Sequence, residues 1–433
     1  MQMDKPDIRR PKILIDNSGY ELRNMGDVAM LVVAVQRIYE MYPDADLHIF
    51  TTEVDRLKKF VPGVKPVTLK GRRTWGMAWN ILGGIHKLIP QQFHHDLLRL
   101  EQNIKINRPL LAKRWITFRL TKRGYDLSAM HQYLELVENA DIVIATGGGF
   151  ITDPFQEHAM QLLQTMAIAK HQGKPIAMFG QGLGPAESLD LLYWAKNILP
   201  KLSLLTLREQ KNSLPFALRA GAEKSCIQVT GDDAVTLANS FTPERLGRCI
   251  GVNLRVATYS GVQQGQLNVI RNIFSQAGNE LDAKLVPVPI SFHDGDSDLA
   301  SLKVLLGEEN IDDSLDEAEN IIKQVGRCRI VVTGSYHAGV FALSQGISVV
   351  GVASSDYYRH KFEGLADQFG GGCFIVDVEK TGFAIQLLQA IKSAWDNAEL
   401  ERDRLLAAAS EQIQKADSAY LELKKIIEEV MEK

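Results

Sequence analysis

Short apolar runs alternate with longer stretches of helical periodicity along most of this chain. The runs of strand length lie at residues 12–16, 47–51, 142–145, 176–179, 204–206 and 227–229, and again at 249–254, 284–287, 329–332, 348–352 and 373–376. Most are followed by turn residues and then a helix-periodic segment, the order typical of helices that connect parallel strands. The pattern predicts an α/β protein built on parallel sheets.

The alternation breaks near residues 241–249 and then restarts, which suggests a boundary between two domains. A chain of 433 residues is too long for one ordinary hydrophobic core. We therefore predict an N-terminal domain over residues 1–245 and a C-terminal domain over residues 246–433. From about Phe383 onward the chain has Lys and Glu at helical spacings and no Pro, which predicts a C-terminal helix that packs one stripe on the body.

Residues 70–125 depart from the α/β pattern and read as a basic helical insertion. Asp96 and Glu101 are the acidic residues that oppose its basic side chains. Aromatic residues are interleaved with twelve basic ones: Lys70, Arg72, Arg73, Lys87, Arg99, Lys105, Arg108, Lys113, Arg114, Arg119, Lys122 and Arg123. Such a segment suits an anionic surface such as lipid headgroups. The alternative is a helical excursion whose aromatic residues are core and whose cations are solvated.

The composition is that of an ordinary globular protein, with 45% hydrophobic and 23% charged residues. A net charge of −3 gives no reason to expect a nucleic-acid partner. The four cysteines lack CxxC or zinc spacing, which favours reduced thiols in a cytoplasmic protein. We expect no secretory signal and no membrane span, so any contact with the inner face of a membrane would be peripheral.

The segment from residue 331 to 350 carries the clearest chemical signal. It reads as a buried strand, a Gly-Ser turn, a short apolar helix and a second buried strand. The first N–H groups of such a helix are unpaired and favour anions. His337 lies there beside Ser335 and Tyr336, so an acid/base side chain adjoins a predicted seat for phosphate or carboxylate. The alternative is that His337 only caps or packs the turn.

Glycines follow two other predicted strands. Gly147, Gly148 and Gly149 come after the run at 142–145, and Gly182 lies in a Gly-rich stretch after the next strand. A loop without side chains brings backbone N–H groups against a ligand. Open α/β sheets bind ligands at the carboxyl ends of their strands, which favours this reading over close strand–helix packing alone.

Charged residues stand at the same predicted edge. Arg208 follows the run at 204–206 and offers a fork for carboxylate or phosphate, unless it forms a structural ion pair with Glu209 or Asp232. Asp27 opens the first helix and can either cap it or act as a base in the cleft.

The second half of the chain adds further cations. Arg255 follows its first strand, and Arg359 and Lys361 lie one strand after the His337 helix. Residues 293–298 have aspartates at alternate positions, but the Gly and Glu pattern of an EF-hand is missing. We therefore predict no metal site and read that segment as a polar loop.

With these motifs in view, the chain resembles the polysaccharide pyruvyl transferase family over most of its length. The resemblance rests on Asn24-Met-Gly-Asp27, Asp141 with the glycine triplet, residues 182–185, Arg208 with Ser213, His337 within residues 333–343, and Lys361 before Gly370. It implies two Rossmann-like domains that face each other across a cleft, as in GT-B glycosyltransferases. It also implies transfer of a pyruvyl group from phosphoenolpyruvate to a sugar diol as a cyclic ketal, in cell-surface polysaccharide synthesis.

On this reading His337 is the general acid, Asp27 is a weaker candidate for the base, and no metal or further cofactor takes part. Arg208, Arg255 and Lys361 would neutralise the donor. The family pattern has an arginine two residues before the histidine, where this chain has Ser335, so another cation substitutes or the donor differs. Two alternatives remain: a GT-B glycosyltransferase that uses a nucleotide sugar, and a non-catalytic binding protein that docks on membrane partners through residues 70–125.

Overall fold

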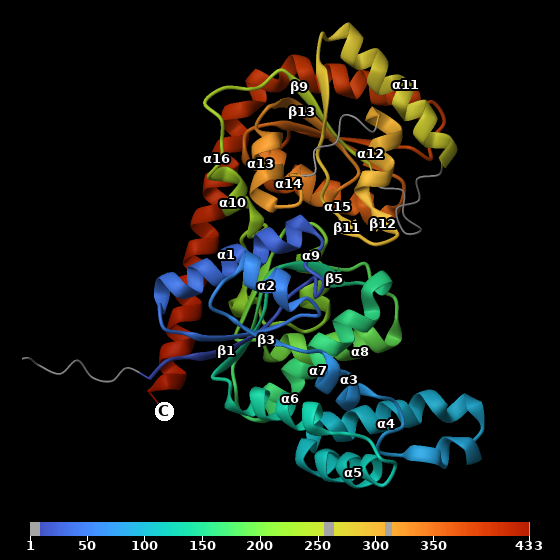
Figure 1. The fold of residues 1–433 in the computed structure, drawn as a ribbon, viewed down its shortest axis with the longest axis vertical. Coiled ribbons are helices and arrows are strands. Elements are labelled where there is room, and N and C mark those ends of the chain that lie inside the picture. Colours follow the sequence, from blue (N-terminus) through green and yellow to red (C-terminus); the bar gives the residue numbers. More distant parts are fainter. Residues whose placement is uncertain (1–8, 255–263, 308–313, 433) are drawn as a thin grey trace, which may run out of the picture.

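The computed structural model describes residues 9–254, 264–307 and 314–432. Two parallel β-sheets, each flanked by helices, form two domains stacked one above the other (Figure 1). The prediction of an α/β protein with parallel sheets is confirmed. No helix in these described ranges is long and apolar enough to cross a membrane.

The first sheet has the strand order β3-β2-β1-β4-β6-β7-β8, and β5 pairs with β6 beside this path. All its pairings are parallel; Ile13, for example, lies opposite Leu47 on one side and Ile142 on the other. Its strands are β1 (Lys12–Asp16), β2 (Asp46–Phe50), β3 (Lys65–Val67), β4 (Ile142–Ala145), β5 (Gly148–Ile151), β6 (Ile176–Leu183), β7 (Leu204–Leu207) and β8 (Ile227–Val229). Strands covered on both faces read as continuous apolar runs, which is why the sequence revealed most of them.

The second sheet has the order β10-β9-β13-β14-β15 and is also fully parallel. Its strands are β9 (Cys249–Asn253), β10 (Lys284–Pro287), β13 (Cys328–Thr333), β14 (Ser348–Ala353) and β15 (Cys373–Asp377). The sequence predicted a polar loop at residues 293–298, but a small antiparallel pair, β11 (Phe292–His293) and β12 (Asp296–Ser297), occupies half of them, and Asp298 begins a helix. The predicted domain boundary at residue 245 falls between β8 and β9, where the chain passes from one sheet to the other.

Helices connect the strands of both sheets. Those between strands of the first domain are α1 (Met25–Met41), α2 (Val54–Phe60), α3 (Lys70–Gly76), α4 (His94–Asn107), α5 (Pro109–Thr121), α6 (Ser128–Asn139), α7 (Gln156–His171), α8 (Leu189–Ile198) and α9 (Ser213–Arg219). The remainder are α10 (Ala234–Asn239), α11 (Gln264–Glu280), α12 (Asp298–Leu306), α13 (Ala318–Val325), α14 (Tyr336–Ser344), α15 (Asp356–Phe369) and α16 (Phe383–Met431).

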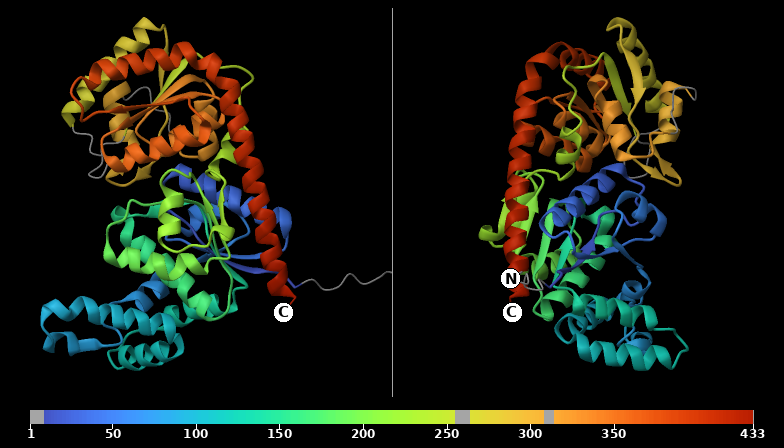
Figure 2. Two further views of the ribbon diagram at one scale, coloured as in Figure 1. Left: turned by 180° about the vertical axis from the view of Figure 1, so that it is seen from behind. Right: turned by 60° about the vertical axis from the view of Figure 1, so that its left-hand side comes forward.

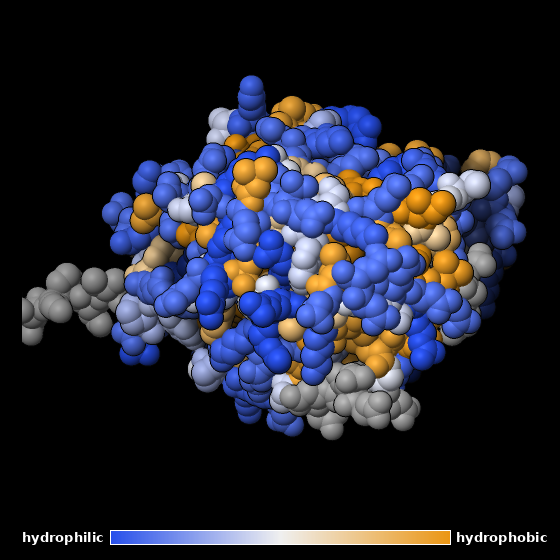
Figure 3. All heavy atoms as spheres, turned by 90° about the horizontal axis from the view of Figure 1, so that it is seen from above, coloured by the Kyte–Doolittle hydropathy of each residue, from blue (hydrophilic) through white to orange (hydrophobic). Residues whose placement is uncertain are grey.

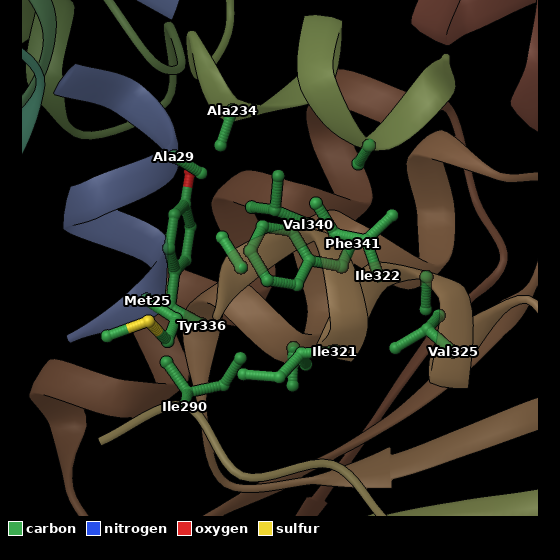
Figure 4. Packing of buried hydrophobic residues seen from close by; sticks show 14 of the residues in the cluster. Met25, Ala29, Ala234, Ile290, Ile321, Ile322, Val325, Tyr336, Val340 and Phe341 are labelled. Carbon is green, nitrogen blue, oxygen red and sulfur yellow. The ribbon is translucent and has the colours of Figure 1, made fainter. Parts of the chain in front are cut away.

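One hydrophobic core continues from the first domain into the second. Met25 and Ala29 of α1 belong to the same buried cluster as Tyr336 and Phe341 of α14. Figure 4 shows these side chains together, with the Tyr336 ring reaching from α14 towards α1. The shared core fixes how the two domains face each other, because separating them would expose this apolar surface to water.

The 49-residue helix α16 runs along one side of both domains (Figure 2). The sequence predicted its start and its single packed stripe, but assigned it to the C-terminal domain. In the structure its second half packs on the first domain, where Asp417 pairs with Arg37 at 2.6 Å and the Tyr42 hydroxyl donates to the carbonyl of Lys424 at 3.2 Å. A long amphipathic helix can cross a domain boundary that strand patterns define, since its stripe does not record which domain it covers.

The basic segment at residues 70–125 divides into two parts. Helix α3 belongs to the first domain, with Trp75 fully buried and Arg72 paired with Asp16 at 2.5 Å. The Arg72 guanidinium also lies 4.5 Å from the centroid of the Phe50 ring. Helices α4 and α5 instead project from the lower end of the domain (Figure 1). Neither sequence interpretation therefore describes the whole segment.

Candidate active site

A cavity of about 330 Å³ lies between the two domains, at the carboxyl ends of strands from both sheets. Its walls come from the start of α1, from β5, from the residue after β7, and from the starts of α14 and α15. Ligands of open α/β sheets bind at this edge. The cavity contains Asp27, Gly149, Arg208, Ser335, His337 and Lys361 of the residues predicted from the sequence.

Three helices begin at the cavity, which makes it favourable for anions. At α1 the cap is Asn24, whose side-chain oxygen accepts from the N–H groups of Gly26 and Asp27 at 3.0 and 3.3 Å. Asp27 is therefore not the cap, the alternative that the sequence left open. Ser335 and Ser355 are the N-cap residues of α14 and α15.

His337 both packs against the first domain and lines the cavity. Its imidazole ring lies so close to the backbone of α1 that a Cβ atom at Gly26 would collide with it. Only glycine at position 26 leaves room for this contact. His337 as a residue is 7% exposed, and its Nε2 lies 3.8 Å from the Oδ2 atom of Asp232. The second domain thus supplies a histidine that faces a carboxylate of the first.

Asp232 links this histidine to Arg208. The Arg208 Nε lies 2.8 Å from Asp232 Oδ2, so the ion pair considered at the sequence level is present. Asp232 also hydrogen-bonds to the side chain of Tyr336 and accepts from the backbone N–H of Ala234 at 2.9 Å. Burial raises the pKa of Asp232, and the charge of Arg208 opposes that shift. The sequence indicated Asp232 only as an ion-pair partner considered for Arg208, and its contact with His337 was missed.

Two cations face each other across Gly149. The position of a Cβ atom on this glycine lies 3.5 Å from Arg208 NH1 and 3.6 Å from Lys361 Nζ. The Lys361 ammonium lies 4.1 Å from the centroid of the Tyr357 ring, and the Arg208 guanidinium lies 4.9 Å from that of Tyr336. Aromatic faces hold both cations in place. A small anion that reached the space above Gly149 would face both positive charges.

The other predicted glycines do not share one role. The sequence predicted that Gly148 and Gly149 form a loop, but these two residues begin strand β5. Strand β6 continues through Gly182. A Cβ on Gly147 would collide with the sulfur of Met30, whereas a Cβ on Gly182 would make ordinary contact with the Cα of Gly149 at 3.5 Å. Close packing is therefore the role that the structure supports for Gly147 but not for Gly182.

Asp27 is partly buried in the cavity wall. Burial raises its pKa, while a hydrogen bond with Ser18 and the charges of Arg208, His293 and Lys361 act in the opposite direction. A carboxyl group with a raised pKa in a cleft is a candidate for proton transfer.

Aromatic rings form another part of the cavity wall, and no sequence motif predicted them. The His158 ring stacks on Tyr20, with centroids 4.5 Å apart and planes within 4°, and lies 4.4 Å from the ring of Phe150. Burial lowers the pKa of His158 to about 4, so this ring is neutral at physiological pH. The contact between Tyr20 and His158 joins residues more than a hundred positions apart, so it leaves no local signal in the sequence.

Other predicted residues lie elsewhere. Arg359 pairs with Asp356 and lies 3.6 Å from Asp377, so its charge is engaged outside the cavity wall. Arg255 lies outside the described residues. Asp298 is buried and accepts from the backbone N–H groups of Ile290 and Ser291, which gives it a structural role. Among the residues with described placement, no cluster of three His, Cys, Asp or Glu side chains could hold a metal ion.

Residues 24–356 match the family model of polysaccharide pyruvyl transferases. The chain belongs to the polysaccharide pyruvyl transferase family. This membership confirms the resemblance seen in the sequence and identifies the protein as a transferase that modifies polysaccharides. Lys361 lies just beyond the matched segment. No curated protein matches the chain.

Solved structures show the same fold. Arabidopsis thaliana UGT89C1, complexed with quercetin, shares 9% identity, with a TM-score of 0.56 and coverage of 98% of this chain and 100% of that one. S. aureus MnaA, solved with UDP, shares 14% identity, with a TM-score of 0.52 and coverage of 93% and 92%. A Listeria monocytogenes protein described as a UDP-N-acetylglucosamine 2-epimerase shares 14%, with a TM-score of 0.54 and coverage of 93% and 94%. The predicted GT-B-like pair of Rossmann-like domains is confirmed.

Proposed function

We propose that this transferase moves a pyruvyl group from phosphoenolpyruvate onto two hydroxyls of a sugar, in a cell-surface polysaccharide or its lipid-linked precursor. The observation that carries the proposal is the pair of cations across Gly149, next to the contact between His337 and Asp232. Phosphoenolpyruvate has a phosphate and a carboxylate, and each needs a positive partner in a site that excludes water. Membership of the polysaccharide pyruvyl transferase family supports the choice of this compound as the anionic donor.

The proposed reaction begins at the enol carbon, C2. One sugar hydroxyl oxygen bonds to C2 while a proton reaches C3, so the methylene becomes a methyl group. The bond between C2 and the oxygen that bridges it to phosphorus then breaks, and inorganic phosphate leaves with the electron pair of that bond. The second hydroxyl oxygen bonds to C2 and closes the ketal, and its proton ends on phosphate through solvent or a base. Phosphoenolpyruvate is a co-substrate here, and the scheme uses no further cofactor.

The residues have separate roles in this scheme. His337 donates the proton to C3, and its Nε2 lies 3.8 Å from the Asp232 carboxylate. Asp27 accepts a hydroxyl proton, a task that its raised pKa suits. Arg208 and Lys361 hold the donor's anionic groups, which compensates for Ser335 at the position where the family has arginine.

Ser335 also favours a second candidate, a GT-B glycosyltransferase that uses a nucleotide sugar. Without the family's arginine, three helix starts and two cations could seat a diphosphate almost as well. Ligand protection against thermal unfolding separates the candidates. We expect phosphoenolpyruvate to raise the Tm of the wild type and UDP-sugars to leave it unchanged. The reverse would favour the glycosyltransferase, and no protection by either would favour a non-catalytic protein.

Matched variants locate the donor site. Lys361→Met should remove the protection by phosphoenolpyruvate, whereas Arg359→Met, two residues away on α15 but engaged outside the cavity, should retain it. His337→Gln should keep the protection but release no phosphate from phosphoenolpyruvate in the presence of a glycan acceptor. Phosphate release by His337→Gln at the wild-type rate would contradict the role of general acid.

A further inference from the structure

Helices α4 and α5 form a hairpin that extends from the lower end of the first domain (Figures 1 and 2). Of sixteen exposed large hydrophobic residues in the described chain, nine lie between residues 70 and 125: Met77, Leu88, Phe93, Leu100, Leu110, Leu111, Trp115, Phe118 and Tyr125. Such a concentration on one projection marks an interaction site. The opposite end of the molecule has mostly hydrophilic side chains with apolar ones scattered among them (Figure 3).

Helix α5 is apolar on two opposite faces. The inner face packs on the protein through Pro109, Ala112, Ile116 and Leu120, which recur at helical spacing. We define the outer face of α5 as five residues of the helix and the C-cap residue that follows it: Leu110, Leu111, Arg114, Trp115, Phe118 and the C-cap Lys122. At about 100° per residue they lie together on the side away from the buried stripe. Leu110 is 72% exposed and Trp115 is 57% exposed, so packing within the chain does not account for these side chains.

Charge on the outer face of α5 indicates its partner. Arg114 and Lys122 are exposed among the apolar residues, and the Lys122 ammonium lies 4.2 Å from the centroid of the Phe118 ring. Residues 109–123 contain no Asp or Glu. Alternating apolar and cationic side chains match a lipid interface, where aromatic and aliphatic groups enter below the headgroups while cations stay level with the phosphates.

We propose that the outer face of α5 docks the protein on an anionic lipid membrane. Phe118 and Trp115 enter the interface, and Arg114 and Lys122 pair with lipid phosphates. This contact does not depend on which donor the cavity binds, because α5 takes no part in the cavity wall. Helix α3 lies between the cavity and the hairpin along the chain. Its Arg73 lines the cavity, and the α4–α5 hairpin follows it in sequence.

Co-sedimentation of the full chain with vesicles tests this proposal. We expect binding to vesicles of phosphatidylcholine with phosphatidylglycerol at low salt, little binding to phosphatidylcholine alone, and release at high salt because exposed charges are screened. The double variant Trp115→Ser/Phe118→Ser should lose affinity by about tenfold or more. Leu400→Ser on α16, where Leu400 is 79% exposed, is the matched control and should bind like the wild type.

Two results would overturn the proposal. One is wild-type protein that stays in the supernatant with anionic vesicles at low salt. The other is equal vesicle binding by the wild type and the double variant when the two proteins also unfold at the same temperature. That result would place the membrane contact elsewhere on the protein. The competing occupant of the outer face of α5 is a second copy of the chain, and light scattering tests for it. If the wild type is a dimer and the double variant is a monomer, the face is a contact between two copies of the chain.

Discussion

Gly149→Ala should separate donor binding from folding. The added methyl group would lie 3.5 Å from Arg208 NH1 and 3.6 Å from Lys361 Nζ, contacts that neither the backbone nor its neighbours must move to accept. Alanine also restricts the unfolded chain more than glycine does, so the free energy of unfolding should stay the same or rise by up to about 1 kcal/mol. The methyl group nevertheless occupies the space that an anion needs to contact both cations.

The expected loss of activity follows from the interactions removed. Each hydrogen bond to a charged group contributes about 1.5–3 kcal/mol, so losing one to two of them should lower kcat/KM by roughly ten- to ten-thousandfold. Steady-state phosphate release with varied phosphoenolpyruvate measures this value, and urea denaturation measures stability. Gly147→Ala is the contrasting variant, because its methyl group would collide with Met30 and should cost stability first. A Gly149→Ala protein with wild-type kcat/KM would refute the assignment of the donor seat.

Two further predictions concern stability. Burial lowers the pKa of His158 from 6.5 to about 4, so its contribution is complete above pH 6.5 and is lost as the pH falls towards 4. Urea denaturation at several pH values should therefore show that wild type loses up to about 3 kcal/mol more than His158→Phe over this interval, and parallel curves would contradict it. Arg72→Met should cost about 3–5 kcal/mol, because it leaves the buried Asp16 carboxylate without its charged partner and with the Tyr20 hydroxyl as a donor. Asp16→Asn in the same chain should restore part of the loss, and an additive double variant would argue against coupling of the pair.

Most strands could be predicted because they read as short apolar runs. The runs predicted at residues 12–16 and 142–145 coincide with the buried strands β1 and β4, and those at 227–229 and 284–287 coincide with the less buried edge strands β8 and β10. Strand β5 escaped because its glycines carry no side chains that could show a strand pattern, and the triplet reads as a loop. Strand β3 is three residues long and contains a proline, so it too lacks a strand signal.

The candidate site was partly visible for a related reason. Arg208 and His337 follow predicted strands, and parallel strands bring their carboxyl ends to one edge, so position alone singles them out. The contacts between these residues could not be derived. Asp232 reaches His337, and His158 stacks on Tyr20, through packing between distant parts of the chain. Local periodicity holds no information about such pairs.

The domain arrangement and the proposed chemistry depend on the same contacts. Arg208 and Asp232 belong to the first domain, whereas Tyr336 and His337 belong to the second, so the acid and its carboxylate partner meet at the contact between the domains. Gly26 of the first domain makes room for this contact, because any side chain there would displace the imidazole. The segment Asn24-Met-Gly-Asp27 is thus explained by a residue more than three hundred positions away. Asn24 caps α1, Gly26 admits the His337 ring, and Asp27 faces the cavity, so one turn of helix brings the proposed acid and base to the wall of the same cavity.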